Sequence, residues 1–183
     1  MDSILQPKRF VVPDLVVSHF YITPGDTVVD IGAGNGYFLE ALANAVGESG
    51  VVYACEIQKN LVDSLTTQAE KFTEGVIKPI WGDVENLQGT KIPDQVADRV
   101  ILVNTLFMLQ DKDTALLEIK RILQPGGKVF VIDWAESYAG LGPPEGMVIS
   151  KDTTINLFEQ SGFVLENDYE SGDHHYGLAF RLA

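Results

Sequence analysis

Three glycines at alternate positions, Gly32, Gly34 and Gly36, lie between a short apolar run and a helical pattern, and Asp30 precedes the first of them by two positions. Glycine lets the backbone turn sharply and lets a ligand lie against the main chain. Unpaired N–H groups at the start of the following helix would then point at that ligand. A carboxylate at Asp30 can accept hydrogen bonds from a ligand ammonium or from loop amides. This segment therefore predicts a ligand-binding loop at the end of a strand.

The spacing of these glycines differs from that of a dinucleotide-binding loop. A dinucleotide fingerprint, G-x-G-x-x-G, needs a third glycine five positions after the first. Here that position holds Tyr37, whose large ring would impair both the approach of a pyrophosphate and the packing of helix on strand. A nucleotide-dependent oxidoreductase is therefore a disfavoured alternative. A glycine-rich turn that binds no ligand is a second alternative.

Composition and charge limit the class of protein. The 183 residues are 45% hydrophobic and 21% charged, which is typical of one globular domain over residues 1–183. The net charge of −13 would repel a phosphate backbone, so a small-molecule partner is favoured over nucleic acid. No apolar run reaches the ~18 residues of a membrane span, and the N-terminus lacks the basic-then-apolar order of a signal peptide. We therefore expect a cytoplasmic location.

Apolar runs alternate with helical stretches, which is typical of a doubly wound α/β domain. The runs predict strands at Thr27–Ile31, Val51–Cys55, Val76–Trp81, Arg99–Val103, Lys128–Asp133, Phe163–Tyr169 and Tyr176–Leu182. Helices are predicted at Tyr37–Val46, Lys59–Phe72, Asp113–Leu123 and Thr153–Ser161, with a further helix at Asp14–Tyr21 in an N-terminal cap of residues 1–25. The single cysteine, Cys55, lies in an apolar run, so we expect a buried strand residue and no disulfide.

The glycine segment, the turn Gly82-Asp83-Val84 and the segment Leu123-Gln124-Pro125-Gly126-Gly127 together resemble class I S-adenosylmethionine (SAM) methyltransferases, and within them small type 11/UbiE-like domains. The resemblance implies a three-layer, Rossmann-like fold. Its sheet has seven mostly parallel strands in the order 3-2-1-4-5-7-6, with the last strand antiparallel. Pro79 in the third predicted strand fits this order, because proline prefers an edge strand.

The same resemblance implies SAM as cofactor and S-adenosylhomocysteine as product. Glu56 would accept the ribose hydroxyls, Asp83 the adenine amino group, and Asn104 the methionine ammonium. The predicted cofactor site consists of Asp30, Gly32, Ala33, Gly34, Asn35, Gly36, Glu56, Ile57, Gly82, Asp83, Val84 and Asn104. Many relatives carry Asp near the position of Asn104, and an amide cannot take a proton, so a general base is not evident there.

The methyl acceptor is expected beyond the fourth and fifth predicted strands. Candidates for a catalytic role are Asp133, His175 and His19, and the glycine- and proline-rich loop Ala135–Ser150 is expected to form a lid or pocket wall. His174 and His175 adjoin the last strand, so alternation should point them to opposite sides. No spacing of ligands predicts a metal site. The sequence thus predicts a SAM-dependent methyltransferase with a small-molecule acceptor, or, as the alternative, a non-catalytic SAM-binding protein with a regulatory role; the oligomeric state stays open.

Overall fold

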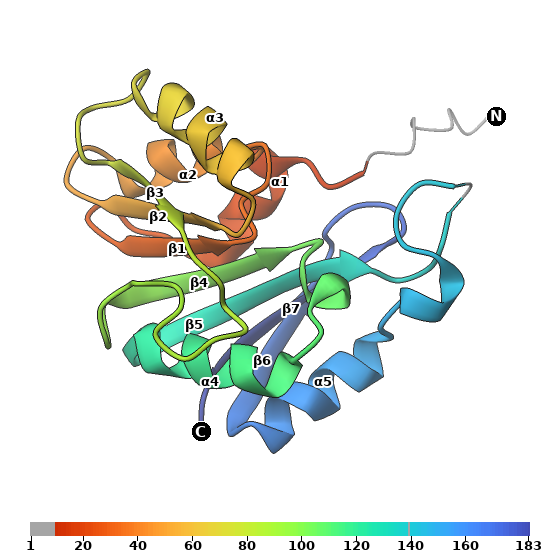
Figure 1. The fold of residues 1–183 in the computed structure, drawn as a ribbon. Helices are drawn as coiled ribbons and strands as arrows, with labels where there is room; N and C mark the ends of the chain where they lie inside the picture. Colours follow the sequence, from red (N-terminus) through yellow and green to blue (C-terminus); the bar gives the residue numbers. More distant parts are fainter. Residues whose placement is uncertain (1–9, 139) are drawn as a thin grey trace, which may run out of the picture.

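The sheet has the predicted topology. The computed structural model describes residues 10–138 and 140–183. Its strands are β1 (Thr27–Ile31), β2 (Val51–Glu56), β3 (Ile77–Trp81), β4 (Ala97–Val103), β5 (Leu123–Trp134), β6 (Phe163–Tyr169) and β7 (His175–Leu182). They form one sheet in the order β3-β2-β1-β4-β5-β7-β6 (Figure 1). Only β7 runs antiparallel to its neighbours β5 and β6. The Rossmann-like α/β fold and its strand order are confirmed.

Helices cover both faces of this sheet (Figure 1). They are α1 (Pro13–Val16), α2 (Leu39–Val46), α3 (Lys59–Ala69), α4 (Lys112–Ile122) and α5 (Lys151–Gln160), with short 3-10 turns η1 (Val17–Phe20), η2 (Leu106–Met108) and η3 (Glu145–Met147). Side chains alternate along each strand, so Val28 packs against α1, η1 and α2 while Val29 packs against α4 and α5. The result is the expected three-layer arrangement.

Helix α4 shows how the sequence produces one of these layers. Its buried residues Ala115, Leu116, Ile119 and Ile122 recur at helical spacing and form one apolar stripe against the sheet. Asp111 caps the helix by accepting a hydrogen bond from the backbone N–H of Thr114 at 3.0 Å. Each fully buried Leu or Ile of this kind contributes about 1.5–3 kcal/mol of burial free energy. The layer is therefore held mainly by apolar contact.

Some predicted boundaries were wrong. The second helix begins at Leu39 instead of Tyr37, because residues 32–38 form successive turns after β1. Helix α3 ends at Ala69 instead of Phe72, and the predicted N-terminal helix is split into α1 and η1. Strand β5 begins at Leu123, not Lys128, because Leu123 already pairs with Ala97 across a register shift.

Three further expectations concern the edges of the fold. Pro79 lies in β3, which is an edge strand as predicted. Of the predicted N-terminal cap, residues 10–25 contain α1 and η1, whereas residues 1–9 lie outside the described residues. No helix in the described ranges combines the length and apolar character needed to cross a membrane.

Candidate functional site

The glycine loop follows β1 and joins it to α2. Gly34 and Gly36 both have left-handed φ values, +56° and +81°, which glycine adopts without the strain that other residues incur. A Cβ atom at Gly34 would meet nothing nearer than the carbonyl oxygen of Gly32 at 3.8 Å, whereas at Gly36 it would lie 2.9–3.0 Å from the side chains of Gln68, Leu39 and Leu65. Gly36 is therefore needed for packing, and Gly34 is open toward a possible ligand.

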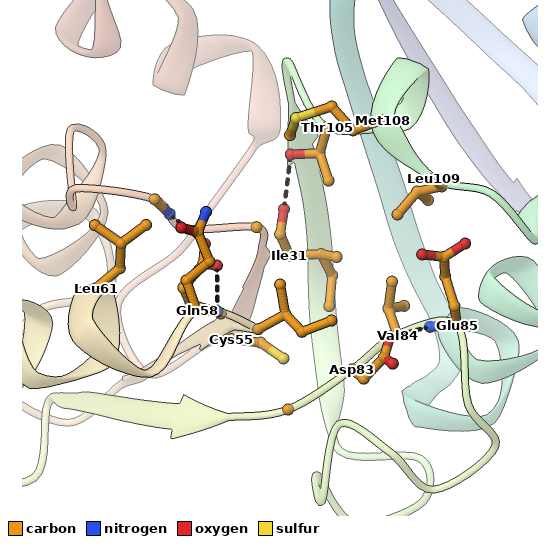
Figure 2. A pocket seen from close by; sticks show the side chains of 15 residues that line it. Ile31, Cys55, Gln58, Leu61, Asp83, Val84, Glu85, Thr105, Met108 and Leu109 are labelled. Atoms are coloured by element: carbon orange, nitrogen blue, oxygen red, sulfur yellow. Dashed lines mark hydrogen bonds between the residues drawn. The ribbon is translucent and has the colours of Figure 1, made fainter.

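A cavity of about 250 Å³ adjoins this loop at the carboxyl ends of β1 and β2. We call it the glycine-loop cavity; its lining residues are Ile31, Gly32, Gly34, Cys55, Glu56, Ile57, Gln58, Leu61, Gly82, Asp83, Val84, Glu85, Thr105, Met108 and Leu109. Gln58 and Leu61 lie on one side of it, and Val84, Glu85 and Leu109 on the opposite side (Figure 2). In a sheet of this kind, ligands bind beyond the carboxyl ends of the strands, where the strand order reverses.

Glu56 connects the end of β2 to the glycine loop. Its carboxylate accepts hydrogen bonds from the backbone N–H of Gly34 at 3.0 Å and from that of Gln58 at 2.8 Å. The residue is only 6% exposed, yet it lines the cavity. A carboxylate has about four acceptor positions. Glu56 therefore holds the loop in place and keeps acceptor capacity for ligand hydroxyls.

The opposite side of the cavity is held by a network of carboxylates. Asp83 accepts hydrogen bonds from the backbone N–H of Glu85 at 2.9 Å and from the Asn86 side-chain amide at 2.6 Å. Glu85 in turn accepts the backbone N–H groups of Gln110 and Asp111, each at 2.5 Å. The turn after β3 is thereby tied to the segment that follows η2, so both edges of the cavity are fixed.

Two buried side chains near the strand ends, the carboxyl of Asp30 and the thiol of Cys55, have raised pKa values. Burial, with repulsion from Glu56, raises the pKa of Asp30 to about 7. Burial raises the pKa of the Cys55 thiol to about 12, so this thiol stays protonated. Cys55 is the buried strand residue that the sequence predicted. A cation close to Asp30 would lower its pKa and favour the ionised carboxylate.

A second cavity, of about 380 Å³, lies on the other side of the end of β4. We call it the aromatic cavity; it is lined by Phe10, Val11, Tyr37, Phe38, Val103, Asn104, Trp134, Leu141, Gly142 and His175. Asn104 lines this cavity and its neighbour Thr105 lines the glycine-loop cavity. The Tyr37 hydroxyl donates to the carbonyl of Val11 at 3.3 Å, which ties the N-terminal segment to the glycine loop.

Asn104 has a strained backbone and an unused acceptor. Its φ is +54°, and its N–H donates to the carbonyl of Ile132 at 2.8 Å. Its side-chain Oδ1 is buried and has no hydrogen-bond partner among the described residues. A buried acceptor left in this state costs about 1–3 kcal/mol. The end of β4 therefore offers an acceptor that a ligand N–H would satisfy.

The two adjacent histidines both lie beside Phe10 but differ in their other contacts. His174 precedes β7 and has a φ of +65°, so strand alternation does not apply to it. Both rings lie next to the ring of Phe10, at centroid distances of 6.0 and 6.5 Å. His174 also stacks on Tyr138 and its Nδ1 lies 2.6 Å from Glu136, whereas His175 packs on Trp134 at 4.2 Å. Of the pair, His175 lines the aromatic cavity.

The other two catalytic candidates occupy different places. Asp133 is buried, and its carboxylate accepts the backbone N–H groups of Trp134 at 2.8 Å and Phe107 at 3.1 Å. Burial raises the pKa of Asp133 to about 6 despite these bonds. His19 stacks on Tyr169 at 4.9 Å and faces a separate hollow beside the β6–β7 turn. Neither residue lines the two cavities described above.

Comparison with known proteins identifies the family. A model of a methyltransferase domain matches residues 29–131, more than half of the chain. The chain belongs to this methyltransferase family. The ubiquinone/menaquinone biosynthesis C-methyltransferase UbiE of Chromobacterium violaceum is 35% identical over 135 residues, which are 70% of this chain and 53% of that protein. This chain therefore spans about half the length of the curated relatives it matches.

Solved structures agree with this assignment. A SAM-dependent methyltransferase from Aquifex aeolicus superposes with a TM-score of 0.86 at 26% identity, covering 95% of this chain and 91% of that one. The [4+2]-cyclase SpnF superposes with a TM-score of 0.74, covering 88% of this chain and 59% of its own, but at 20% identity it shares the fold alone. The family and the Aquifex structure imply SAM as the cofactor.

The described residues fit SAM. Its ammonium offers N–H donors to acceptors such as Asn104 Oδ1, and its positive charge would favour the ionised form of Asp30. Its ribose hydroxyls match the remaining acceptor capacity of Glu56. The open backbone at Gly34 leaves room for close approach.

The cavities include most, but not all, of the predicted cofactor residues. Those in the glycine-loop cavity are Gly32, Gly34, Glu56, Ile57, Gly82, Asp83 and Val84, while Asn104 lines the aromatic cavity. Asp30, Ala33, Asn35 and Gly36 do not line either cavity. Further lining residues that the predicted cofactor set did not include are Ile31, Cys55, Gln58, Leu61, Glu85, Thr105, Met108 and Leu109. Thr105 had one signal, its position next to Asn104; its hydroxyl donates to the carbonyl of Ile31 at 3.1 Å.

Proposed function

We propose that this chain transfers a methyl group from SAM to a small, uncharged acceptor held in the aromatic cavity. One observation carries the proposal: the consecutive residues Asn104 and Thr105 line different cavities, so the two cavities share a boundary at the end of β4. A cofactor in the glycine-loop cavity and an acceptor in the aromatic cavity would therefore be neighbours. Methyl transfer depends mainly on such positioning, at near-attack distances of ~3–3.5 Å.

The side chains have distinct tasks in this proposal. When bound, SAM supplies an electrophilic methyl group on a sulfonium. Glu56 and Asp83 of the glycine-loop cavity would hold the ribose and the adenine amino group. Asn104 Oδ1, at the boundary with the aromatic cavity, would hold the ammonium. Trp134 and Tyr37 would hold the acceptor by apolar contact and exclude water. The net charge of −13 supports a small molecule in preference to nucleic acid.

The relatives suggest which acceptors to test first. The curated relatives are C-methyltransferases of ubiquinone and menaquinone biosynthesis, and the aromatic cavity is lined mostly by apolar side chains. Quinone-like ring compounds in their reduced form are therefore the first class to screen. Thiols and simple phenols complete the panel.

Calorimetric titration with SAM, S-adenosylhomocysteine and NADH, in parallel, tests the cofactor. Micromolar binding of the two adenosyl ligands and none of NADH is expected. Transfer of a labelled methyl group to any member of the panel would support the enzyme. SAM binding without transfer to any acceptor would favour the non-catalytic alternative, and NADH binding alone would refute the proposal.

A further inference from the structure

The side chains that line the aromatic cavity have the polarity of a site for an uncharged ring compound. Four of its lining residues are aromatic: Phe10, Tyr37, Phe38 and Trp134. None of the described lining residues is Asp, Glu, Lys or Arg, so an acceptor with a carboxylate or phosphate would find no counter-charge there. The ring of Phe10 lies 6.1 Å from that of Trp134 in a tilted arrangement. Aromatic side chains in these walls can make offset or edge contacts with a bound ring, which are the preferred contacts of aromatic pairs. The cavity therefore favours ring compounds.

His175 places one hydrogen-bond acceptor in this apolar wall. Its Nδ1 lies 2.8 Å from the carbonyl oxygen of Asp173, and a carbonyl can only accept, so Nδ1 carries the proton. Burial lowers the pKa of His175 below its usual value, which keeps the ring neutral near pH 7. In a neutral imidazole protonated at Nδ1, the other nitrogen, Nε2, carries a lone pair. His175 is thus fixed as an acceptor toward its surroundings.

That acceptor is unused in the described part of the chain. His175 Nε2 is buried and has no hydrogen-bond partner among residues 10–138 and 140–183. A buried acceptor without a partner is costly, and a ligand that donates a hydrogen bond would recover that cost. The neighbouring His174 also has a buried Nε2 without a partner, with its Nδ1 directed at Glu136, but of the two histidines it is His175 that lines the aromatic cavity.

From this geometry, and resting on the proposed function, we infer that the acceptor is a planar ring compound with an acidic hydroxyl and that His175 Nε2 takes the hydroxyl proton. The O–H bond breaks with its electron pair left on oxygen, and the proton forms a new N–H bond at Nε2, giving an imidazolium. For a simple phenol, the oxygen pair forms the bond to the methyl carbon, the methyl–sulfur bond breaks with its pair on sulfur, and S-adenosylhomocysteine leaves. In this step His175 is a catalytic residue, because it takes up the proton of the acceptor in addition to positioning it.

Two matched probes test the recognition of the hydroxyl. 4-Nitrophenol and its methyl ether, 4-nitroanisole, differ only in the O–H group, and both can be titrated into the protein with S-adenosylhomocysteine present, at a pH where the phenol is un-ionised. The wild-type protein should bind the phenol about 5–150-fold more tightly, the range that follows from satisfying one buried acceptor. Equal affinities for the two probes, or no binding of the phenol, would overturn the inference.

Two substitutions separate hydrogen bonding from proton uptake. His175→Asn keeps an N–H that can reach the carbonyl of Asp173 but deletes Nε2, so the preference for the phenol should vanish. His175→Gln keeps an acceptor oxygen, so the preference should largely remain. Transfer of labelled methyl from SAM to 4-nitrophenol should nevertheless fall by roughly 10²-fold or more in His175→Gln, as expected when a general base is lost.

The controls distinguish failure of this inference from failure of the proposed function. His19→Asn changes a histidine outside the aromatic cavity and should leave both the preference and the transfer rate unchanged. All variants should bind S-adenosylhomocysteine as the wild type does, which also verifies that they fold. If the wild type does not bind S-adenosylhomocysteine, the proposed function fails. If it does, but His175→Asn keeps the preference or the wild type does not methylate the phenol, only the assignment of His175 fails.

Discussion

Gly34 and Gly36 provide a matched pair of substitutions that separates cofactor binding from folding. Both residues have positive φ values within 25° of each other, so alanine at either position incurs a similar backbone strain of about 1–2 kcal/mol. At Gly36 the added methyl group would also press on Gln68, Leu39 and Leu65 at 2.9–3.0 Å. Overpacking of this kind costs about 1–3 kcal/mol. Gly36→Ala should therefore lower the free energy of unfolding by about 2–5 kcal/mol, and Gly34→Ala by only about 1–2 kcal/mol.

The two substitutions should rank differently in their effect on the affinity for SAM. At Gly34 the methyl group would project into open space at the edge of the glycine-loop cavity, where the cofactor is expected. Gly34→Ala should weaken SAM by tenfold or more, about 1.4 kcal/mol, although it folds better than Gly36→Ala. Urea unfolding gives the stability of each variant and calorimetry gives its affinity for SAM. Unchanged SAM affinity in Gly34→Ala, or equal stabilities of the two variants, would refute the reasoning.

Three other substitutions test other parts of the site. The pKa of Asp30 rises from 3.8 to about 7 on folding, so the folded chain keeps a proton that the unfolded chain has lost. The free energy of unfolding should therefore fall as pH rises from about 4 to 7, and Asp30→Asn should flatten this slope in urea titrations. Glu56→Lys should weaken SAM by ~1–3 kcal/mol, measured by calorimetry, because it removes the acceptor of the Gly34 N–H and ribose contacts. Gly142→Ala would press a methyl group on the Trp134 ring at 2.6 Å; it should weaken 4-nitrophenol severalfold while leaving S-adenosylhomocysteine affinity unchanged.

Features with a local signal were predictable from the sequence. The strand Thr27–Ile31, the glycine loop after it and the acidic Glu56 at the end of the second strand were all placed correctly, because each follows from local chain chemistry. The edge position of β3 followed from one proline, Pro79, which cannot donate in a central strand. Such signals indicate the part of the glycine-loop cavity that lies at the strand ends, but not lining residues such as Gln58 and Glu85, which follow the strands.

The aromatic cavity had a weaker signal: the loop Ala135–Ser150 was predicted as a lid or pocket wall, and its residues Leu141 and Gly142 line the cavity, but no spacing predicted the full set of aromatic walls. It is built from Phe10, Tyr37, Trp134 and His175, which are far apart in the sequence and meet only when the sheet is complete. The orientation of His174 depends on a single left-handed φ before β7, and a histidine gives no local indication of that conformation. Contacts of this kind are decided by tertiary packing, which residue spacing does not encode.

This difference between the two cavities has a consequence for function. In the proposed function the cofactor would be held by groups at the ends of neighbouring strands, which any chain with this fold and loop can present. In the proposed function the acceptor would be held by the N-terminal segment at Phe10, the loop at Leu141 and Gly142, and the start of β7 at His175. Loops and terminal segments vary more freely than the strands of a fold. Because fold alone does not set the reaction, as the distant cyclase with the same fold illustrates, the acceptor must be sought through the chemistry of these few residues. Among them His175 combines a fixed tautomer with an unused lone pair, and the phenol–anisole comparison addresses that group directly.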